Sequence, residues 1–213
     1  MQPAPPDITF ACAGCGQQFS LPASFAGRKA TCKNCGAPIV VPIPEGMKTA
    51  GTPAAPKVSP RTRRLVAESL QMSEFFKDFP LIEIKSLEGN PPEVYQIEYH
   101  VNSLARGFMN KPRPRDTHLV EIRLTSDYPR LAPQCKMLTP IFHPNIDETT
   151  ICVGDHWTAG ERLVDLVIRI GQMIAYQAYN IKSPLDGEAA MWADLNADKL
   201  PTDGRDLIPP RGE

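Results

Sequence analysis

Six cysteines are distributed unevenly along this chain, and their arrangement limits the folds open to its N-terminal part. Four of them form two Cys-x-x-Cys pairs with sixteen residues between the pairs: Cys12, Cys15, Cys32 and Cys35. Four thiolates at this spacing are typical of a tetrahedral zinc site, which leaves no coordination position open for catalysis. The spacing therefore predicts a structural zinc ion as cofactor.

Two other interpretations of this module remain open. A pair of redox dithiols is disfavoured, because neither cysteine pair lies between a strand and a helix. The sequence from Ala26 to Cys32 resembles bacterial zinc ribbons. Its basic residues, Arg28, Lys29 and Lys33, could contact nucleic acid or an acidic protein, or simply form the solvated face of a folding staple.

Composition divides the chain into three parts. Residues 1–43 hold the expected zinc ribbon. Residues 44–60 are rich in Pro, Ala, Gly and Thr and are expected to be a flexible linker, and residues 61–213 carry the periodic patterns of a folded domain. The net charge of −1 gives no global attraction to nucleic acid or acidic membranes. We find no secretory signal and no stretch that could span a bilayer, so a cytoplasmic location with reduced thiols is expected.

Periodicity in the third part predicts an α+β domain. Ser59 and Pro60 are a common helix start, and the helical pattern continues to Pro80. Period-two alternation then predicts four short strands, near residues 82–84, 95–101, 120–124 and 135–137, which favours an antiparallel meander. An apolar stripe beginning at Leu163 predicts an amphipathic helix. The last helix is expected to begin at Ser183-Pro184, with Ser183 as its cap.

The stretch between the third predicted strand and the last helix contains several short motifs. Tyr128-Pro129 and Pro133 form a proline-rich turn, and His143-Pro144-Asn145, Ile151-Cys152, Trp157, Asn180 and Ser183-Pro184-Leu185 follow in that order. This succession resembles the ubiquitin-conjugating enzyme family, in a bacterial type with an N-terminal zinc ribbon. The resemblance covers residues 61 to about 197 and is most specific over 122–192. It implies the family's fold: an N-terminal helix, a four-stranded antiparallel meander and C-terminal helices.

The resemblance also implies a set of catalytic residues. Cys152 would carry a ubiquitin-like protein as a thioester, which needs an exposed thiol on a loop. Asn145 would donate to the oxyanion of acyl transfer, or alternatively brace the loop. His143 would be mainly structural. Ser183 stands where many members have an Asp that prepares the acceptor lysine, although it could simply cap the helix.

Several further residues receive weaker predictions. Asp155 and His156 could orient an acceptor or belong to a solvated loop. Cys135 is expected to be an inert core residue. The segment between the second and third strands is basic, with Arg106, Lys111, Arg113 and Arg115, and is interpreted as a solvated loop or as a docking patch for the carried protein. The family docks its adenylating activating enzyme on the first helix, where Arg61, Arg63 and Arg64 suit an acidic partner.

The leading hypothesis is a conjugating enzyme that passes its cargo from the activating enzyme to an amine on a protein substrate. The main alternative is a non-catalytic module that binds a ubiquitin-like protein and uses the zinc ribbon for recruitment. A zinc-ribbon nucleic-acid binder and a cysteine hydrolase using Cys152 with His143 or His156 are weaker alternatives, because the net charge disfavours the first and no orienting residue completes the second.

Overall fold

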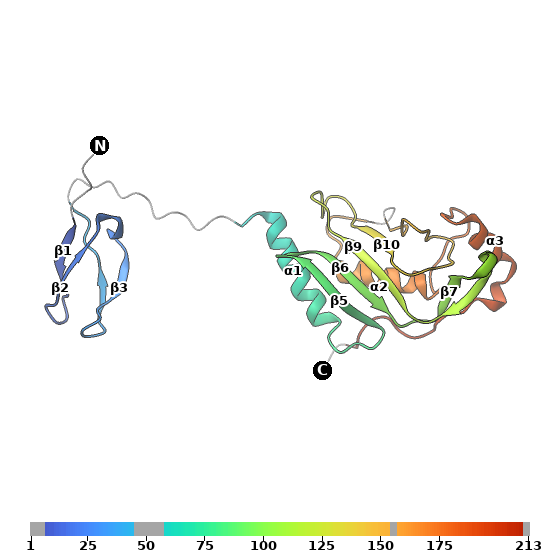
Figure 1. Ribbon diagram of the computed structural model, residues 1–213, viewed down its shortest axis with the longest axis horizontal. Coiled ribbons are helices and arrows are strands. Elements are labelled where there is room, and N and C mark those ends of the chain that lie inside the picture. Colours follow the sequence, from blue (N-terminus) through green and yellow to red (C-terminus); the bar gives the residue numbers. More distant parts are fainter. Residues whose placement is uncertain (1–6, 45–57, 154–156, 211–213) are drawn as a thin grey trace. The chain divides into compact units, whose positions relative to one another are not determined.

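The computed structural model describes residues 7–44, 58–153 and 157–210 (Figure 1). The chain forms two compact units, Met1–Lys57 and Val58–Glu213. Most of the linker predicted over 44–60 lies outside the described residues.

The smaller unit consists of two β-hairpins, each containing one cysteine pair. Strand β1 (Ile8–Ala11) pairs with β2 (Gln18–Leu21), and β3 (Lys29–Thr31) pairs with β4 (Pro38–Val40). The short helix η1 (Ala23–Phe25) joins them. The two turns have the same hydrogen bonds: Gly16 N–H donates to Cys12 O at 2.8 Å, and Gly36 N–H donates to Cys32 O at 2.9 Å. Both glycines have positive φ, a conformation that glycine adopts without the steric cost of a Cβ.

The larger unit is built on a four-stranded antiparallel sheet with the order β10-β9-β6-β5. Its strands are β5 (Ile82–Gly89), β6 (Pro92–Tyr99), β9 (His118–Arg123) and β10 (Gln134–Met137). They match the four predicted strands in position and direction, so the predicted α+β meander is confirmed. Cys135 is buried in β10, and burial raises the pKa of its thiol to about 12, as expected for an inert core residue.

Two helices complete the main core. Helix α1 (Pro60–Phe75) starts as predicted, with the Ser59 side chain accepting from Thr62 N–H at 3.0 Å and Pro60 at the first position. Helix α2 (Leu163–Ile174) buries its predicted apolar stripe against the sheet. Tyr99 of β6 donates to Val167 O at 3.0 Å, and a Cβ at Gly171 would lie 3.0 Å from the Tyr99 ring. A larger residue at Gly171 would therefore separate this helix from the sheet.

The segment predicted as a basic loop between the second and third strands is a second sheet, so the prediction of an irregular loop was wrong. Strand β7 (Ser103–Arg106) pairs with β8 (Pro112–Arg115), and η2 (Phe108–Asn110) forms the turn between them. The sequence hides this hairpin because β8 alternates Pro with Arg, and proline within a segment argues against a strand unless the strand lies at an edge.

The last helix, α3 (Gly187–Leu195), begins three residues later than predicted. Asp186 is its cap and accepts from Ala189 N–H at 3.0 Å, so the prediction that Ser183 caps this helix was wrong. Leu185 N–H and Asp186 N–H both donate to Pro144 O, which holds the chain extended before the helix starts.

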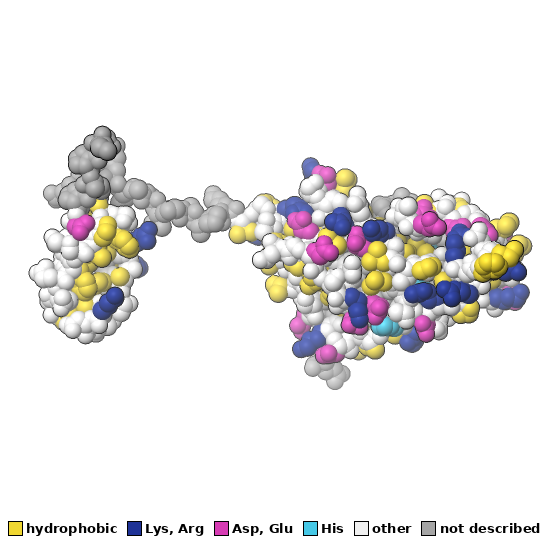
Figure 2. Space-filling view, in the orientation of Figure 1, with side chains coloured by type: hydrophobic (Ala, Val, Ile, Leu, Met, Phe, Trp, Pro, Cys, Tyr) yellow, Lys and Arg dark blue, Asp and Glu magenta, His cyan; other side chains and the backbone are white. Residues whose placement is uncertain are grey.

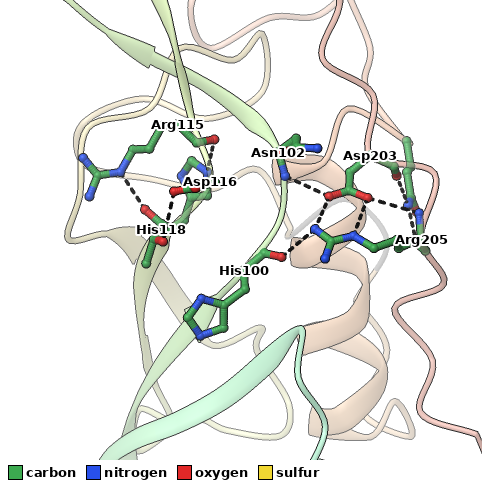
Figure 3. A network of polar contacts seen from close by, with 9 residues as sticks. His100, Asn102, Arg115, Asp116, His118, Asp203 and Arg205 are labelled. Carbon is green, nitrogen blue, oxygen red and sulfur yellow. Dashed lines mark hydrogen bonds and ion pairs between the residues drawn. The ribbon is translucent and has the colours of Figure 1, made fainter.

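After α3 and η4 (Ala197–Lys199), the chain returns along the end of the larger unit. The Asp203 carboxylate accepts from Asn102 N–H at 2.9 Å and from Arg205, and Arg205 also donates to His100 O at 2.8 Å (Figure 3). Asp203 N–H donates to Ala175 O at 3.1 Å. These bonds fasten the C-terminal segment to the turn between β6 and β7 and to the end of α2.

Candidate active site and metal site

Cys152 lies where the chain leaves the edge of the main sheet. Ile151 N–H donates to Cys135 O of β10 at 3.0 Å, and Ile151 forms a β-bridge with Ile146. Cys152 N–H donates to Asn145 O at 3.1 Å. The backbone on the N-terminal side of the thiol is therefore fixed, and Cys152 itself is only partly buried, in contrast to Cys135. This is the position that an acyl-carrying cysteine requires.

Asn145 is 6% exposed, and its side chain bonds to the segment before α3. Its Oδ1 accepts from Asn180 N–H at 2.7 Å, and its Nδ2 donates to Asn180 O at 2.7 Å and, less closely, to Ser183 O at 3.4 Å. The amide thus ties the loop that precedes Cys152 to residues 180–183. In this arrangement the Nδ2 group already has two acceptors.

His143 is completely buried. Its Nδ1 accepts from Asn145 N–H at 3.1 Å, so the proton of the neutral ring is on Nε2. Burial lowers the pKa of His143 to about 3, only partly opposed by the Met173 backbone. The Tyr176 ring centroid lies 4.7 Å from that of His143, and the Tyr176 hydroxyl donates to Phe142 O. A neutral, enclosed imidazole of this kind holds the turn together and cannot exchange protons with a substrate.

Ser183 is exposed and lies in the segment that Asn145 holds. Its carbonyl oxygen accepts from Asn145, whereas its side chain is available on the surface. Asp155 and His156, the other two candidates for orienting an acceptor, lie outside the described residues.

Glu68 was not expected from the sequence to join α1 to other parts of the domain. This carboxylate is 2% exposed and accepts from three elements: Arg64 Nε at 2.6 Å, Tyr128 hydroxyl at 2.7 Å and Leu163 N–H at 2.9 Å. The Tyr128 ring packs against Trp157, with the centroids 5.7 Å apart. The sequence did contain an indication that Glu68 is buried, because this residue lies on the apolar face of α1 between Leu65 and Met72.

These contacts also change the interpretation of the three arginines on α1. Arg61 donates to Glu93 at 2.6 Å and to Thr125 O at 2.9 Å, and Arg64 bonds Glu68 and Glu161 O. Only Arg63 is exposed. Two of the three arginines therefore fasten α1 to the domain, and Arg63 is the one whose side chain is exposed.

The four N-terminal cysteines come together in the smaller unit. Their Sγ atoms all lie within 4.8 Å of one another, and the Cys12–Cys35 and Cys15–Cys32 pairs are each 3.7 Å apart. Thiolates at the corners of a tetrahedron with Zn–S bonds of about 2.3 Å would be about 3.8 Å apart. Gly14 N–H also donates to Cys12 Sγ at 3.4 Å. The cluster therefore has the donor set and spacing of a structural zinc site.

Comparison with known proteins identifies the family of the larger unit. Residues 92–200, just over half of the chain and including Asn145, Cys152 and Ser183, match the family described as "Ubiquitin-conjugating enzyme". The chain belongs to the ubiquitin-conjugating enzyme family. Helix α1 and the cysteine cluster lie outside the matched residues.

Individual members of the ubiquitin-conjugating enzyme family are distant in sequence. The chain is 26% identical over 124 residues to ubiquitin-conjugating enzyme E2 N of Macaca fascicularis, covering 56% of this chain and 79% of that protein. It is 26% identical over 122 residues to the Drosophila melanogaster E2 N, covering 55% and 78%. A crystal structure of a putative ubiquitin conjugating enzyme from Plasmodium yoelii aligns with a TM-score of 0.49 at 20% identity, covering 66% of this chain and 87% of that one. Within the described residues, no helix has the length and apolar character to cross a membrane.

Proposed function

We propose that this member of the ubiquitin-conjugating enzyme family carries a ubiquitin-like protein as a thioester on Cys152 and transfers it to an amine of a protein substrate. One observation supports this proposal above the others: Cys152 is partly exposed on a segment that is bonded to the sheet edge and to Asn145. The proposed alternative, a non-catalytic binding module, would not need a thiol in such a position.

The reaction has two steps, charging of Cys152 and transfer to the amine, and each breaks one acyl bond and forms another. The Cys152 thiolate attacks the thioester carbonyl on an activating enzyme, and that enzyme's cysteine leaves as a thiolate. An unprotonated amine then attacks the new thioester, the tetrahedral oxyanion collapses, and Cys152 leaves as a thiolate while the amine proton passes to solvent or to a base. The acceptor lysine must first lose a proton from a group with an ordinary pKa of about 10.4.

We assign supporting roles to the surrounding residues from their contacts. Asn145 braces residues 180–183 against the turn before Cys152, because its side-chain amide is already bonded there. His143 keeps that turn rigid as a buried neutral ring. Ser183, exposed and no longer required as a helix cap, is the candidate for contacting the acceptor amine. Arg63 is the α1 residue we assign to the activating enzyme.

The smaller unit would hold a structural zinc ion through Cys12, Cys15, Cys32 and Cys35, a bacterial-type zinc ribbon attached to the conjugating domain. With four thiolate ligands the ion would have no open position, so its contribution is to the fold of this unit. A reducing, cytoplasmic environment would keep these thiols and Cys152 reduced.

A charging assay tests the proposal. The full chain is mixed with its cognate activating enzyme, ubiquitin-like protein and ATP, and the products are separated with and without reductant. Wild-type protein should form an adduct that reductant removes, Cys152→Ser should form one that resists reductant, and Cys152→Ala should form none. Cys135→Ala is the matched control, because that buried thiol should not affect charging. A wild-type protein that binds the ubiquitin-like protein but forms no adduct would support the binding module instead.

A further inference from the structure

We propose that the β7–β8 hairpin is a docking surface for an extended acidic segment of a partner protein, with an apolar residue of that segment held at the hairpin tip. The surface is separate from Cys152, so the inference does not depend on thioester chemistry. It replaces the sequence interpretation of this region as a solvated loop.

The tip presents apolar side chains to solvent. Phe108 is 88% exposed and Met109 is 74% exposed. Figure 2 shows hydrophobic side chains gathered at the end of the larger unit, close to Lys and Arg side chains, where Figure 1 places the hairpin. Met109 and Asn110 have φ of 54° and 59°, a left-handed conformation that residues with a Cβ adopt at a cost. A turn that keeps a strained backbone and two exposed apolar side chains is suited to contacting another molecule.

A row of cations leads away from the tip. Lys111 immediately precedes β8, and Arg113 and Arg115 lie on it, so the three residues alternate at intervals of about 7 Å. None of the three forms an ion pair with the described residues. Arg115 is partly buried and its Nε donates to Thr117 O at 2.6 Å, whereas Lys111 and Arg113 are exposed. Arg106 on β7, by comparison, is already paired with Asp186 and Glu188. The two exposed cations, Lys111 and Arg113, match an extended segment with acidic residues at alternate positions.

Lys111 and Arg113 keep their side chains exposed. Ala105, which lies opposite Arg113, is small and buried, so it does not cover the Arg113 side chain. At Gly107 a Cβ would lie 2.8 Å from Lys111 O, so the close approach of the two backbones at this turn requires glycine. The charged ends of Lys111 and Arg113 therefore remain open to a partner.

Recognition must be through side chains rather than by addition of a strand. Gly107 N–H donates to Lys111 O at 2.9 Å, and in an antiparallel pair of strands the residues that exchange hydrogen bonds alternate with those that do not. The β8 residues whose backbone groups point away from β7 are therefore Pro112 and Pro114. Proline has no N–H to donate to a further strand. This edge cannot pair with another strand in the usual way, which also protects it from self-association.

The hairpin is held firmly before any partner arrives. Phe142 N–H donates to Leu104 O at 2.9 Å, the Arg106 guanidinium lies 5.2 Å from the centre of the Phe142 ring, and Arg106 pairs with Asp186 and Glu188 of the α3 start. A preorganised surface loses little conformational entropy on binding. Arg106 and Asn110 also line a groove of about 960 Å³ that extends to the turn at 147–149.

The direction of the row favours a peptide over a membrane. Because the cations recede from the tip by about 7 Å for each pair of residues, a flat anionic surface touching Phe108 would reach only the nearest cation. An extended chain lying along β8 can contact Phe108, Lys111 and Arg113 together.

The test uses the isotope-labelled full chain and a short synthetic peptide with leucine at one end and glutamate at alternate positions, made in both chain directions. Titration followed by NMR should shift the hairpin amides, and the affinity should fall with added salt. Phe108→Ser with Met109→Ser should weaken binding about 10-fold, and Lys111→Gln and Arg113→Gln about 3-fold each. Cys152→Ala should bind like the wild type, which separates this surface from the proposed thioester function.

Matched controls are Lys77→Gln and Leu70→Ser, an exposed cation and an exposed apolar residue at the α1 end of the unit, which should bind like the wild type. The proposal is overturned if the peptide with glutamine in place of glutamate binds equally well, or if neither set of hairpin variants weakens binding. It is also overturned if the chain does not bind the peptide but binds vesicles of phosphatidylcholine and phosphatidylserine through Phe108 and Met109.

Discussion

The side-chain amide of Asn145 exchanges two hydrogen bonds with the backbone of Asn180, each 2.7 Å long. An asparagine amide has the same donor and acceptor pattern as a peptide group, so it replaces a missing backbone partner at this point. The loop before Cys152 and the segment before α3 are thereby joined as one unit. These two hydrogen bonds link the two sides of the candidate site without involving the thiol.

Asn145→Ala should lower stability and transfer together. Removing the side chain leaves Asn180 N–H and O without their partners, which should reduce the free energy of unfolding by about 1–3 kcal/mol. Charging of Cys152 should persist, whereas discharge to free lysine should slow because residues 180–183 are no longer held. Urea unfolding and single-turnover discharge measure the two effects. Lys182→Ala is the control, because it shortens an exposed side chain of the same segment; a similar loss in this variant would contradict the bracing role.

Glu68→Ala should lower the free energy of unfolding more than any substitution of an exposed residue on α1. Three donors, from Arg64, Tyr128 and Leu163, lose a charged acceptor in a buried position, so we expect a loss of about 3 kcal/mol in the free energy of unfolding. Tyr128→Phe removes one donor and should cost about 1 kcal/mol. Denaturant unfolding measures both. Glu74→Ala, on the exposed face of α1, should change stability by less than about 0.5 kcal/mol, and equal losses at 68 and 74 would refute the account.

Acid should destabilise the larger unit before most carboxylates titrate. Burial lowers the pKa of His118 to about 4 and that of His143 to about 3, against about 6.5 in an unfolded chain. The unfolded state therefore binds more protons, and stability falls as the pH drops from about 6.5 toward 4, by up to about 1.4 kcal/mol per pH unit for each histidine. Urea midpoints measured across this range should show the slope, and His118→Gln should reduce it. An unchanged slope in this variant would contradict the prediction.

Zinc removal should affect the smaller unit alone. The purified chain should contain one zinc ion, and Cys12→Ser or Cys32→Ser should lose it, because each removes one of four clustered thiolates. Released metal measured with a colorimetric chelator checks this. The NMR signals of residues 58–210 should stay in place when the metal is removed, since the chain divides into two compact units. Cys135→Ser is the control and should retain its zinc; a wild-type protein without metal would refute the assignment.

Much of the main sheet could be predicted because its strands are half-buried and alternate regularly, as in Tyr95, Ile97 and Tyr99. The start of α1 was readable because Ser59 and Pro60 act locally, within one helical turn. The same Ser-Pro pattern at Ser183-Pro184 predicted the start of the last helix wrongly. There Pro144 O accepts from Leu185 and Asp186 and keeps the chain extended, and that partner lies far away in sequence.

The amino-acid sequence by itself determined the cysteine cluster, the order of the main-sheet strands and of the helices around them, and the motifs around Cys152, because these depend on spacing along the chain. Only the tertiary structure decided that Asn145 is bonded to Asn180, that Glu68 joins three elements, and that the basic segment is a hairpin with an exposed tip. Such contacts join residues far apart in the chain, and a side chain's partners are set by which elements pack together rather than by its own neighbours.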